Sequence, residues 1–313
     1  MLSKRISAEI DKVRDCVSHP WQQHKLICNR KNWNMLYASL DAIEHSQAAI
    51  EYFYALPKFS VHTGGYLYLY GLLQAIFVQQ DAVSNLNLSL NNQKIDWEKD
   101  FHQIYEIREL RNDAIGHPSG RGGGVSFHCL SFNTINNTTF DIASYRKEKN
   151  YEFECKSVDL TNLRETQEDT IVKILHDISS RLTDEFNQHK RQFMGVKLLD
   201  LIPNTFNDSL SKVCEGTHIE SDNVSDYFNR LEACYIDIKK RIIERRGSIE
   251  ASVNIRDVIT ELDYIMSNVK KYIEYKIPYD DEVADNLIES LKTNFQELTE
   301  FMQSIDDEFN IEE

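Results

Sequence analysis

Apolar side chains recur at three- and four-residue intervals along most of the chain, and this spacing predicts amphipathic helices. The predicted helices of the first two thirds cover residues 3–18, 33–56, 66–90, 96–115 and 161–193. The segment from Tyr66 to Val78 is apolar on nearly every side, so we expect this helix at the centre of a bundle. Polar turns separate the long helices, which favours an up-and-down arrangement. The segment that follows His19-Pro20 and contains Trp21 is predicted to be a loop.

The pattern changes between residues 119 and 159, where a run of glycines precedes three segments with strand-like alternation. The segments VSFHCLSF, TTFDIASY and YEFECKSV begin at Val125, Thr138 and Tyr151. Alternation combined with Phe, Tyr and Val predicts two or three antiparallel strands. The sequence therefore predicts a mainly α fold, a helical bundle with a small antiparallel β insertion at about 123–160.

A domain boundary is predicted between Met194 and Asn207, in a short apolar piece flanked by glycine and proline. The expected domains are 1–194, the bundle with its β insertion, and 205–313, a helical C-terminal region. In the second domain, apolar spacing predicts helices over residues 222–246, 249–276 and 281–309.

The formal charge of −15 excludes a protein that coats nucleic acid without sequence preference, because the average surface would repel phosphate. Any RNA site must therefore be a local basic pocket. The dense basic run of the C-terminal region is KKRIIERR, from Lys239 to Arg246, which we interpret as a solvated helix face, with an RNA-guiding or partner-binding role as the alternative. The six cysteines have neither CxxC nor metal-ligand spacing, which favours free thiols in a reducing compartment.

No apolar run reaches the ~18 residues of a membrane span, and the N-terminus lacks an apolar core of signal-peptide length. We therefore expect a cytoplasmic protein with no membrane partner. The ten histidines form no HExxH motif, and the sequence predicts neither a metal nor another cofactor.

One segment holds an unusual density of polar chemistry, IYEIRELRNDAIGHP from Ile104 to Pro118. Its apolar residues keep helical spacing, and Gly116 and Pro118 are expected to end the helix. The closing turn of this helix, where side chains reach solvent or a partner, carries Arg111, Asn112, Asp113 and His117. If the protein has an active centre, we expect it at this turn.

Arg111 and His117 have five residues between them, and a polar Asn directly follows the Arg. This arrangement resembles the R-x(4–6)-H motif of the HEPN superfamily. Its members are compact helical-bundle domains, often dimeric, and many are metal-independent endoribonucleases of toxin, defence and RNA-processing systems. The resemblance covers about residues 33–193, interrupted by the predicted strands, and says nothing about the C-terminal third.

The spacing rule matches this chain at two further places. The pair Arg14 and His19 lies on the first short helix, with no bundle helix before it. The pair Arg121 and His128 crosses a glycine turn into a predicted strand. Only RNDAIGH follows two long apolar helices and lies at the end of a third, so its context favours this copy of the motif.

The residue types at this turn suit cleavage of RNA by its own 2′-hydroxyl. His117 titrates near neutral pH and is able to act as the base or the acid. Arg111 offers a permanently charged fork for phosphate oxygens and for the charge that develops on them. Asn112 is expected to orient the scissile phosphate or His117. The residues expected to contact substrate around them are Arg108, Asp113 and Arg121.

Six residues of an uninterrupted helix turn through about 600°, which leaves Arg111 and His117 about 120° apart. Either the chain bends at Gly116, or the two side chains meet their copies across a two-fold axis. The resemblance implies the second arrangement, a composite site in a homodimer. A purely structural interpretation stays open, in which Arg111 offsets the helix dipole and pairs with Glu106 or Asp113.

The sequence thus favours a metal-independent endoribonuclease of HEPN type that acts as a homodimer on RNA. A toxin or anti-phage role is implied by the resemblance alone, and the C-terminal helices would then bind an antitoxin or a trigger ligand. The alternative is a non-enzymatic helical interaction or regulatory protein with an inactive HEPN-like bundle.

Overall fold

A computed structural model describes residues 4–59, 64–116, 119–121, 123–131, 134–215, 223–250, 252–275 and 282–310. His117, the expected catalytic histidine, lies outside these described residues. The chain divides into two compact units, the first of Met1–Val17 with Leu26–Leu182 and the second of Ser18–Lys25 with Thr183–Glu313. The division therefore falls within a long helix, and the segment between Met194 and Asn207 belongs to the second unit.

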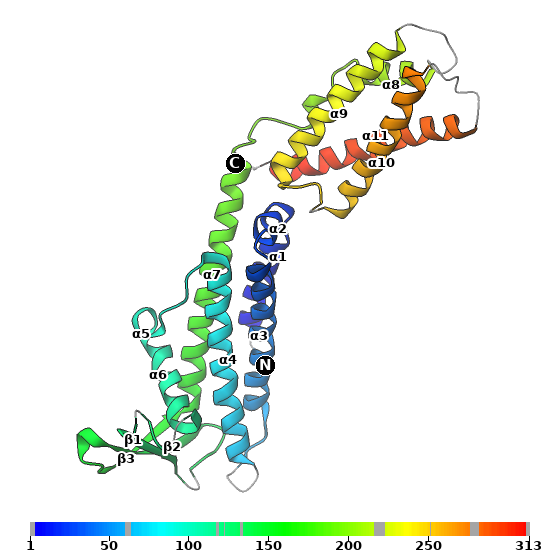
Figure 1. The fold of residues 1–313 in the computed structure, drawn as a ribbon. Helices are drawn as coiled ribbons and strands as arrows, with labels where there is room; N and C mark the ends of the chain where they lie inside the picture. Colours follow the sequence, from blue (N-terminus) through cyan, green and yellow to red (C-terminus); the bar gives the residue numbers. More distant parts are fainter. Residues whose placement is uncertain are drawn as a thin grey trace. The chain divides into compact units, whose positions relative to one another are not determined.

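Long helices build the first unit, in which α3, α4 and α7 run side by side (Figure 1). Its helices are α1 (Lys4–Ser18), α3 (Arg30–Ala55), α4 (Gly65–Asn91), α5 (Trp97–Asp100), α6 (His102–Arg111) and the first part of α7 (Leu160–Arg191). The apolar stripe predicted on the first helix is buried and packs into the core of this unit, through Ile6, Ile10, Val13 and Val17. The mainly helical fold is thereby confirmed.

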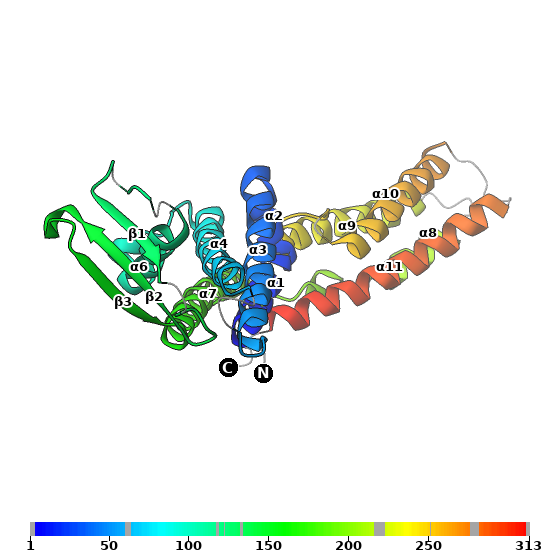
Figure 2. The ribbon, with the colours of Figure 1, turned by 90° about the horizontal axis from the view of Figure 1, so that it is seen from below.

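A three-stranded antiparallel sheet interrupts the helices, as predicted. Its strands are β1 (Ser126–Leu130), β2 (Thr139–Arg146) and β3 (Phe153–Asp159), in the order β1-β2-β3. Figure 2 shows the strands lying next to α6. Phe140, Ile142 and Val158 bury one face of the sheet against the helical core. On the other face, Phe127, Tyr145 and Phe153 lie in one cross-strand row, in which Phe127 and Phe153 are exposed.

Four buried glutamines connect the helices of the first unit through a chain of hydrogen bonds. Gln80 Nε2 on α4 donates to Gln167 Oε1 on α7 at 2.8 Å. Gln167 Nε2 donates to Gln79 Oε1, and Gln79 Nε2 to Gln47 Oε1 on α3, both at 2.9 Å. The two ends are charged, because Arg108 donates to Gln80 and Gln47 donates to Glu51. Every amide therefore has a partner in a core that water does not reach.

The predicted helix from Asp96 to Ile115 is wrong as a single element. Asp96 is the expected N-cap, and its side chain accepts from the backbone N–H of Lys99 at 3.2 Å. However, Phe101 leaves helical geometry with φ −143° and ψ 66°, which separates α5 from α6. Beyond Arg111 the chain continues as a π-helical turn, η2 (Asn112–Gly116).

The second unit contains α2 (Pro20–Ile27), the end of α7, η4 (Leu199–Leu201), α8 (Phe206–Glu215), α9 (Val224–Arg246), α10 (Val253–Glu274) and α11 (Glu282–Phe309). The last three begin and end within four residues of their predicted limits. The loop predicted around Trp21 is wrong, because Pro20 begins a helix in the position where its missing N–H costs nothing. Helix α8 was not predicted. Within the described ranges, no helix combines the length and apolarity needed to cross a membrane.

The interpretation of KKRIIERR as a solvated helix face is wrong for its last two residues. Arg245 is 1% exposed, and its Nη2 donates to the backbone carbonyl of Val196 at 2.6 Å. Its guanidinium carbon lies 4.9 Å from the centre of the Phe193 ring. Arg246 forms an ion pair with Glu308 at 2.5 Å. These two cations hold the second unit together and are not free to bind an RNA phosphate.

Replacement of Gln79 by Leu should break the glutamine chain at its centre. The amide of Gln167 and the carbonyl of Gln47 would lose their partners, so we expect the free energy of unfolding to fall by about 2–4 kcal/mol. Urea denaturation followed by circular dichroism measures the change. The matched control is Gln103→Leu at an exposed position of α6, for which a change within about 0.5 kcal/mol is expected. Equal shifts in the two variants would contradict a role for the buried chain.

Candidate functional site

The turn with the expected catalytic residues has π-helical geometry. The backbone N–H of Asn112 donates to the carbonyls of both Arg108 and Glu109, where the α-helix gives way to the wider turn. Ala114 is 2% exposed and fixes this turn on the core of the first unit. π turns in α-helices are frequent at functional sites, because the extra residue changes the direction of the following side chains. The turn leads into His117, which the structure does not describe.

Arg111 lies at the end of α6 and is half-buried. Its Nη2 donates to Gln74 Oε1 at 2.7 Å and its Nη1 to Asn112 Oδ1 at 3.1 Å. The guanidinium carbon is 4.5 Å from the centre of the Phe77 ring. The Nε atom is buried and has no hydrogen-bond partner among the described residues.

No carboxylate of the described chain lies within 4.0 Å of the Arg111 guanidinium. The structural interpretation in which Arg111 pairs with Glu106 or Asp113 is therefore wrong. Its neighbours are neutral amides and an aromatic ring, which orient the guanidinium without cancelling its charge. Such a cation is prepared to bind an anion, because the charge is already partly desolvated and its direction is fixed.

Gly116 makes room for this guanidinium. A Cβ atom at position 116 would lie 3.0 Å from Arg111 Nη1 and 3.3 Å from Asn112 Oδ1. Both distances are shorter than ordinary van der Waals contact. Gly116 therefore allows the Arg111 side chain to fold back over its own turn and to bind Asn112.

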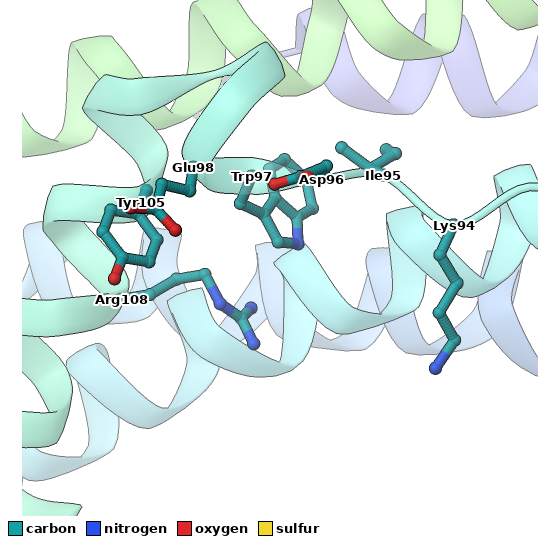
Figure 3. A pocket seen from close by; sticks show the side chains of 7 residues that line it. All are labelled: Lys94, Ile95, Asp96, Trp97, Glu98, Tyr105 and Arg108. Carbon is teal, nitrogen blue, oxygen red and sulfur yellow. The ribbon is translucent and has the colours of Figure 1, made fainter.

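Arg108 is held differently from Arg111. It stacks on the same Phe77 ring at 4.2 Å, but its Nη2 forms an ion pair with Asp81 at 2.8 Å and its Nη1 donates to Gln80. Figure 3 shows Arg108 beside Trp97 and Tyr105 in a pocket of about 420 Å³. Trp97 is only 8% exposed, so its ring supports the wall and offers little surface for stacking.

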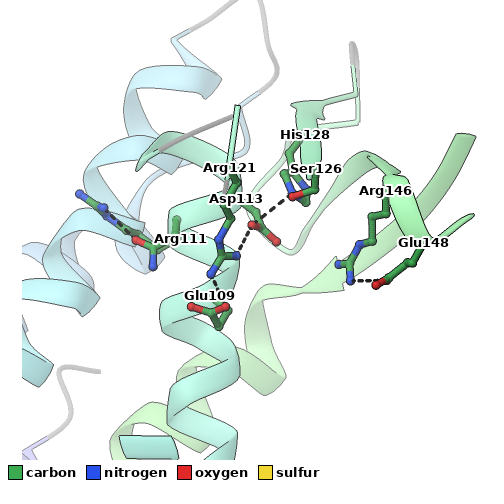
Figure 4. A network of polar contacts seen from close by, with 9 residues as sticks. Glu109, Arg111, Asp113, Arg121, Ser126, His128, Arg146 and Glu148 are labelled. Carbon is green, nitrogen blue, oxygen red and sulfur yellow. Dashed lines mark hydrogen bonds and ion pairs between the residues drawn. The ribbon is translucent and has the colours of Figure 1, made fainter. Parts of the chain in front are cut away.

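Asp113 and Arg121, both expected to contact substrate, bind each other (Figure 4). Arg121 Nη1 donates to Asp113 Oδ1 at 2.5 Å, and Arg121 Nη2 forms a short ion pair with Glu109. His128 Nε2 on β1 lies 3.3 Å from the same Asp113 oxygen and 3.0 Å from Ser126 Oγ. We call Glu109, Asp113, Arg121 and His128 the Asp113 cluster.

The Asp113 cluster lines a pocket of about 430 Å³ together with Val125, Ser126, Arg146 and Glu148. His128 was not among the residues predicted from the sequence, because the pair Arg121 and His128 crosses from a glycine turn into a strand and not into a helix. The spacing of Arg121 and His128 was the available signal in the sequence. The hairpin folds onto η2, and both side chains thereby reach Asp113.

The combination of Ser126, His128 and Asp113 does not form a nucleophilic triad. In such a triad the two ring nitrogens of the histidine bind the serine and the carboxylate separately. Here a single nitrogen, Nε2, lies between Ser126 Oγ and Asp113 Oδ1. The His128 side chain is also only 3% exposed.

Charge and burial set the protonation of this cluster. Burial lowers the pKa of His128; the Asp113 carboxylate opposes this effect, whereas Arg146 and Arg121 add to it. Burial disfavours the charge of Arg121, but its hydrogen bonds to Glu109 and Asp113 outweigh this cost and the pKa of Arg121 is raised. A neutral His128 and a charged Arg121 are thus favoured at neutral pH.

Among the residues that the structure describes, no group of three or more His, Cys, Asp or Glu side chains is placed to hold a metal ion. Comparisons of the chain with protein-family models, curated proteins and solved structures found no match. The chain's own residues are therefore the basis for its proposed function.

Replacement of Gly116 by Ala should displace the Arg111 guanidinium and leave the fold intact. The clash falls on the end of a flexible side chain, so we expect loss of the Arg111–Asn112 hydrogen bond and a stability change below about 1 kcal/mol. A shifted Arg111 Nε signal in ¹H–¹⁵N NMR spectra, with unchanged core resonances, checks this outcome. Gly120→Ala is the matched control, because a Cβ atom there meets nothing within 4 Å. An Arg111 signal unchanged in both variants would contradict the proposed contact.

The buried neutral His128 should make the protein sensitive to acid. Its pKa in the folded state is below the value of the unfolded chain, so its contribution to stability is present above about pH 6.5 and is lost as the pH falls. We expect the free energy of unfolding of the wild type to decrease more between about pH 7.5 and pH 5.5 than that of His128→Gln. Denaturant titrations at several pH values measure the difference, and exposed His45→Gln should behave as the wild type.

Proposed function

We propose that this chain is a metal-independent endoribonuclease of HEPN type, with Arg111, Asn112 and His117 as its catalytic residues. The observation that supports it most is Arg111, a guanidinium held by amides and an aromatic ring, with no carboxylate partner among the described residues. Partial burial of this guanidinium costs desolvation free energy, which no carboxylate among the described residues offsets. A phosphate oxygen of RNA would supply the missing negative charge.

In the proposed reaction, the 2′-hydroxyl of the RNA attacks the adjacent phosphate and the 5′-oxygen leaves. His117 takes the hydroxyl proton or supplies the proton of the leaving oxygen. Arg111 stabilises the charge that accumulates on the phosphate oxygens. Asn112 accepts from Arg111 through its Oδ1, which supports a role for Asn112 in aligning the guanidinium toward the phosphate.

The proposal includes a homodimer, because one reaction needs both a base and an acid while the motif of each chain carries one histidine. Two copies of the turn would provide two guanidiniums and two imidazoles in one composite cleft. The role in a toxin or anti-phage system, with the C-terminal helices binding an antitoxin or a trigger, extends this proposal on the resemblance alone.

The alternative is a non-enzymatic interaction protein. Exposed apolar side chains at one end of the sheet favour it, since Val125, Phe127, Tyr151 and Phe153 are 38–62% exposed. Contiguous exposed apolar side chains often mark protein-binding surfaces. In that case the hydrogen bonds of Arg111 would serve the fold alone.

Purified protein incubated with total RNA in EDTA separates the two functions. For the ribonuclease we expect cleavage without metal, and a loss of about 100-fold or more in rate in Arg111→Ala and in His117→Ala. Arg5→Ala and His45→Ala replace exposed residues of the same unit and should retain the wild-type rate. Cleavage that both catalytic substitutions leave intact would contradict the proposal.

A latent enzyme that waits for a trigger would give no cleavage in this assay. Expression of the chain in cells covers that case: growth inhibition that disappears in Arg111→Ala and His117→Ala would support the ribonuclease. The absence of both cleavage and toxicity would favour the interaction protein.

A further inference from the structure

The Asp113 cluster offsets the repulsion between two carboxylates beside Arg111. Glu109 on α6 and Asp113 in η2 are four residues apart, and like charges at this spacing repel each other. Arg121 lies between them and donates an Nη1–H to Asp113 and an Nη2–H to Glu109. Arg121 therefore offsets the repulsion and connects Glu109 on α6 to Asp113 in η2, across the transition from α-helix to π turn.

The backbone fixes Arg121 in this position. Its N–H donates to the carbonyl of Ser126 at 3.0 Å, and its own carbonyl accepts from Gly124 and Val125 at 3.2 and 3.0 Å. The guanidinium therefore projects from a tight turn at the start of the hairpin. Arg121 connects this turn to η2.

His128 makes the second connection. Asp113 Oδ1 accepts a hydrogen bond from Arg121 Nη1 and lies 3.3 Å from His128 Nε2 on β1. The Asp113 side chain is 13% exposed. Asp113 directly follows Asn112, the acceptor of the Arg111 hydrogen bond. Whatever holds Asp113 therefore also holds the turn that orients Arg111.

We propose that Asp113, Arg121 and His128 are positioning residues, which hold η2 so that Arg111 and Asn112 face the phosphate, and that none of the three binds substrate. This inference rests on the proposed ribonuclease function and revises the expected roles of Asp113 and Arg121. Arg121 Nη1 donates to Asp113 and Arg121 Nη2 donates to Glu109, and the His128 side chain is buried. An RNA phosphate would have to displace Glu109 and Asp113 to reach Arg121.

Arg121→Gln tests the proposal, with hydrogen exchange and cleavage kinetics as independent measurements. We expect amide exchange in 112–116 to accelerate about tenfold or more, since a charge-assisted hydrogen bond is lost, while the amides of α3 and α4 stay protected. In the cleavage assay kcat should fall about 10-fold or more while KM changes less than about threefold, because alignment is lost and substrate contacts are kept.

Arg14→Gln is a closely matched control. Arg14 also bridges two carboxylates, Asp41 and Glu44, and its side chain is 32% exposed compared with 29% for Arg121. This variant should change neither the exchange of 112–116 nor the kinetics. Asp113→Asn provides a second route if Arg121→Gln does not fold, and it should reproduce the faster exchange and the lower kcat.

The outcomes separate this proposal from the proposed function. Unchanged exchange in 112–116 would overturn the positioning role whatever the activity. Faster exchange with unchanged kcat, or a raised KM at constant kcat, would also overturn it, the latter in favour of substrate binding by Arg121. Faster exchange in a protein that shows neither cleavage nor toxicity would support the hold on η2 and remove the ribonuclease.

Discussion

The buried glutamine chain is the constraint on which the first unit depends. Gln47, Gln79, Gln80 and Gln167 come from α3, α4 and α7, and each amide satisfies the next. If one helix slid by a turn, several polar groups would lose their partners in an interior without water. An apolar core alone would tolerate several such arrangements. Because Gln74 and Phe77 are on the same helix as two of these glutamines, the chain also fixes the supports of Arg111.

Three arginines close to η2 have different neighbours, and these neighbours determine whether each charge is paired. Arg108 faces Asp81 and ends the glutamine chain, and Arg121 faces two carboxylates. Arg111 faces amides and a ring, so its hydrogen bonds fix its direction while its charge stays uncompensated. Identity and spacing in the sequence do not distinguish these cases, because the partners come from other helices and from the hairpin. The structure of the first unit makes the distinction directly.

The helical bundle and the sheet were predictable because their signals are local: apolar periodicity, an N-cap at Asp96 and strand-like alternation. The break at Phe101 and the π turn after Arg111 were not, since both depend on packing that overrides an uninterrupted helical pattern. Helix α2 was missed because Pro20 was interpreted as an end rather than a beginning. The contact between Asp113 and His128 was hidden for a different reason, as it requires the hairpin to fold back onto η2.

The glutamine chain also has a polarity. Between Arg108 and Glu51, each of the four glutamines accepts a hydrogen bond from the group before it and donates one to the group after it, so the amide dipoles align along the chain. A guanidinium is able only to donate and a carboxylate only to accept, so the two ends select this one orientation. A lysine in place of Glu51 would oppose it, since an ammonium group would face the donating end of Gln47. Rotation of all four amides would only move the contact between two donors to the other end, where Gln80 meets Arg108. The charge of one residue at the edge of the bundle would thus leave the interior chain with a mismatched junction in either orientation.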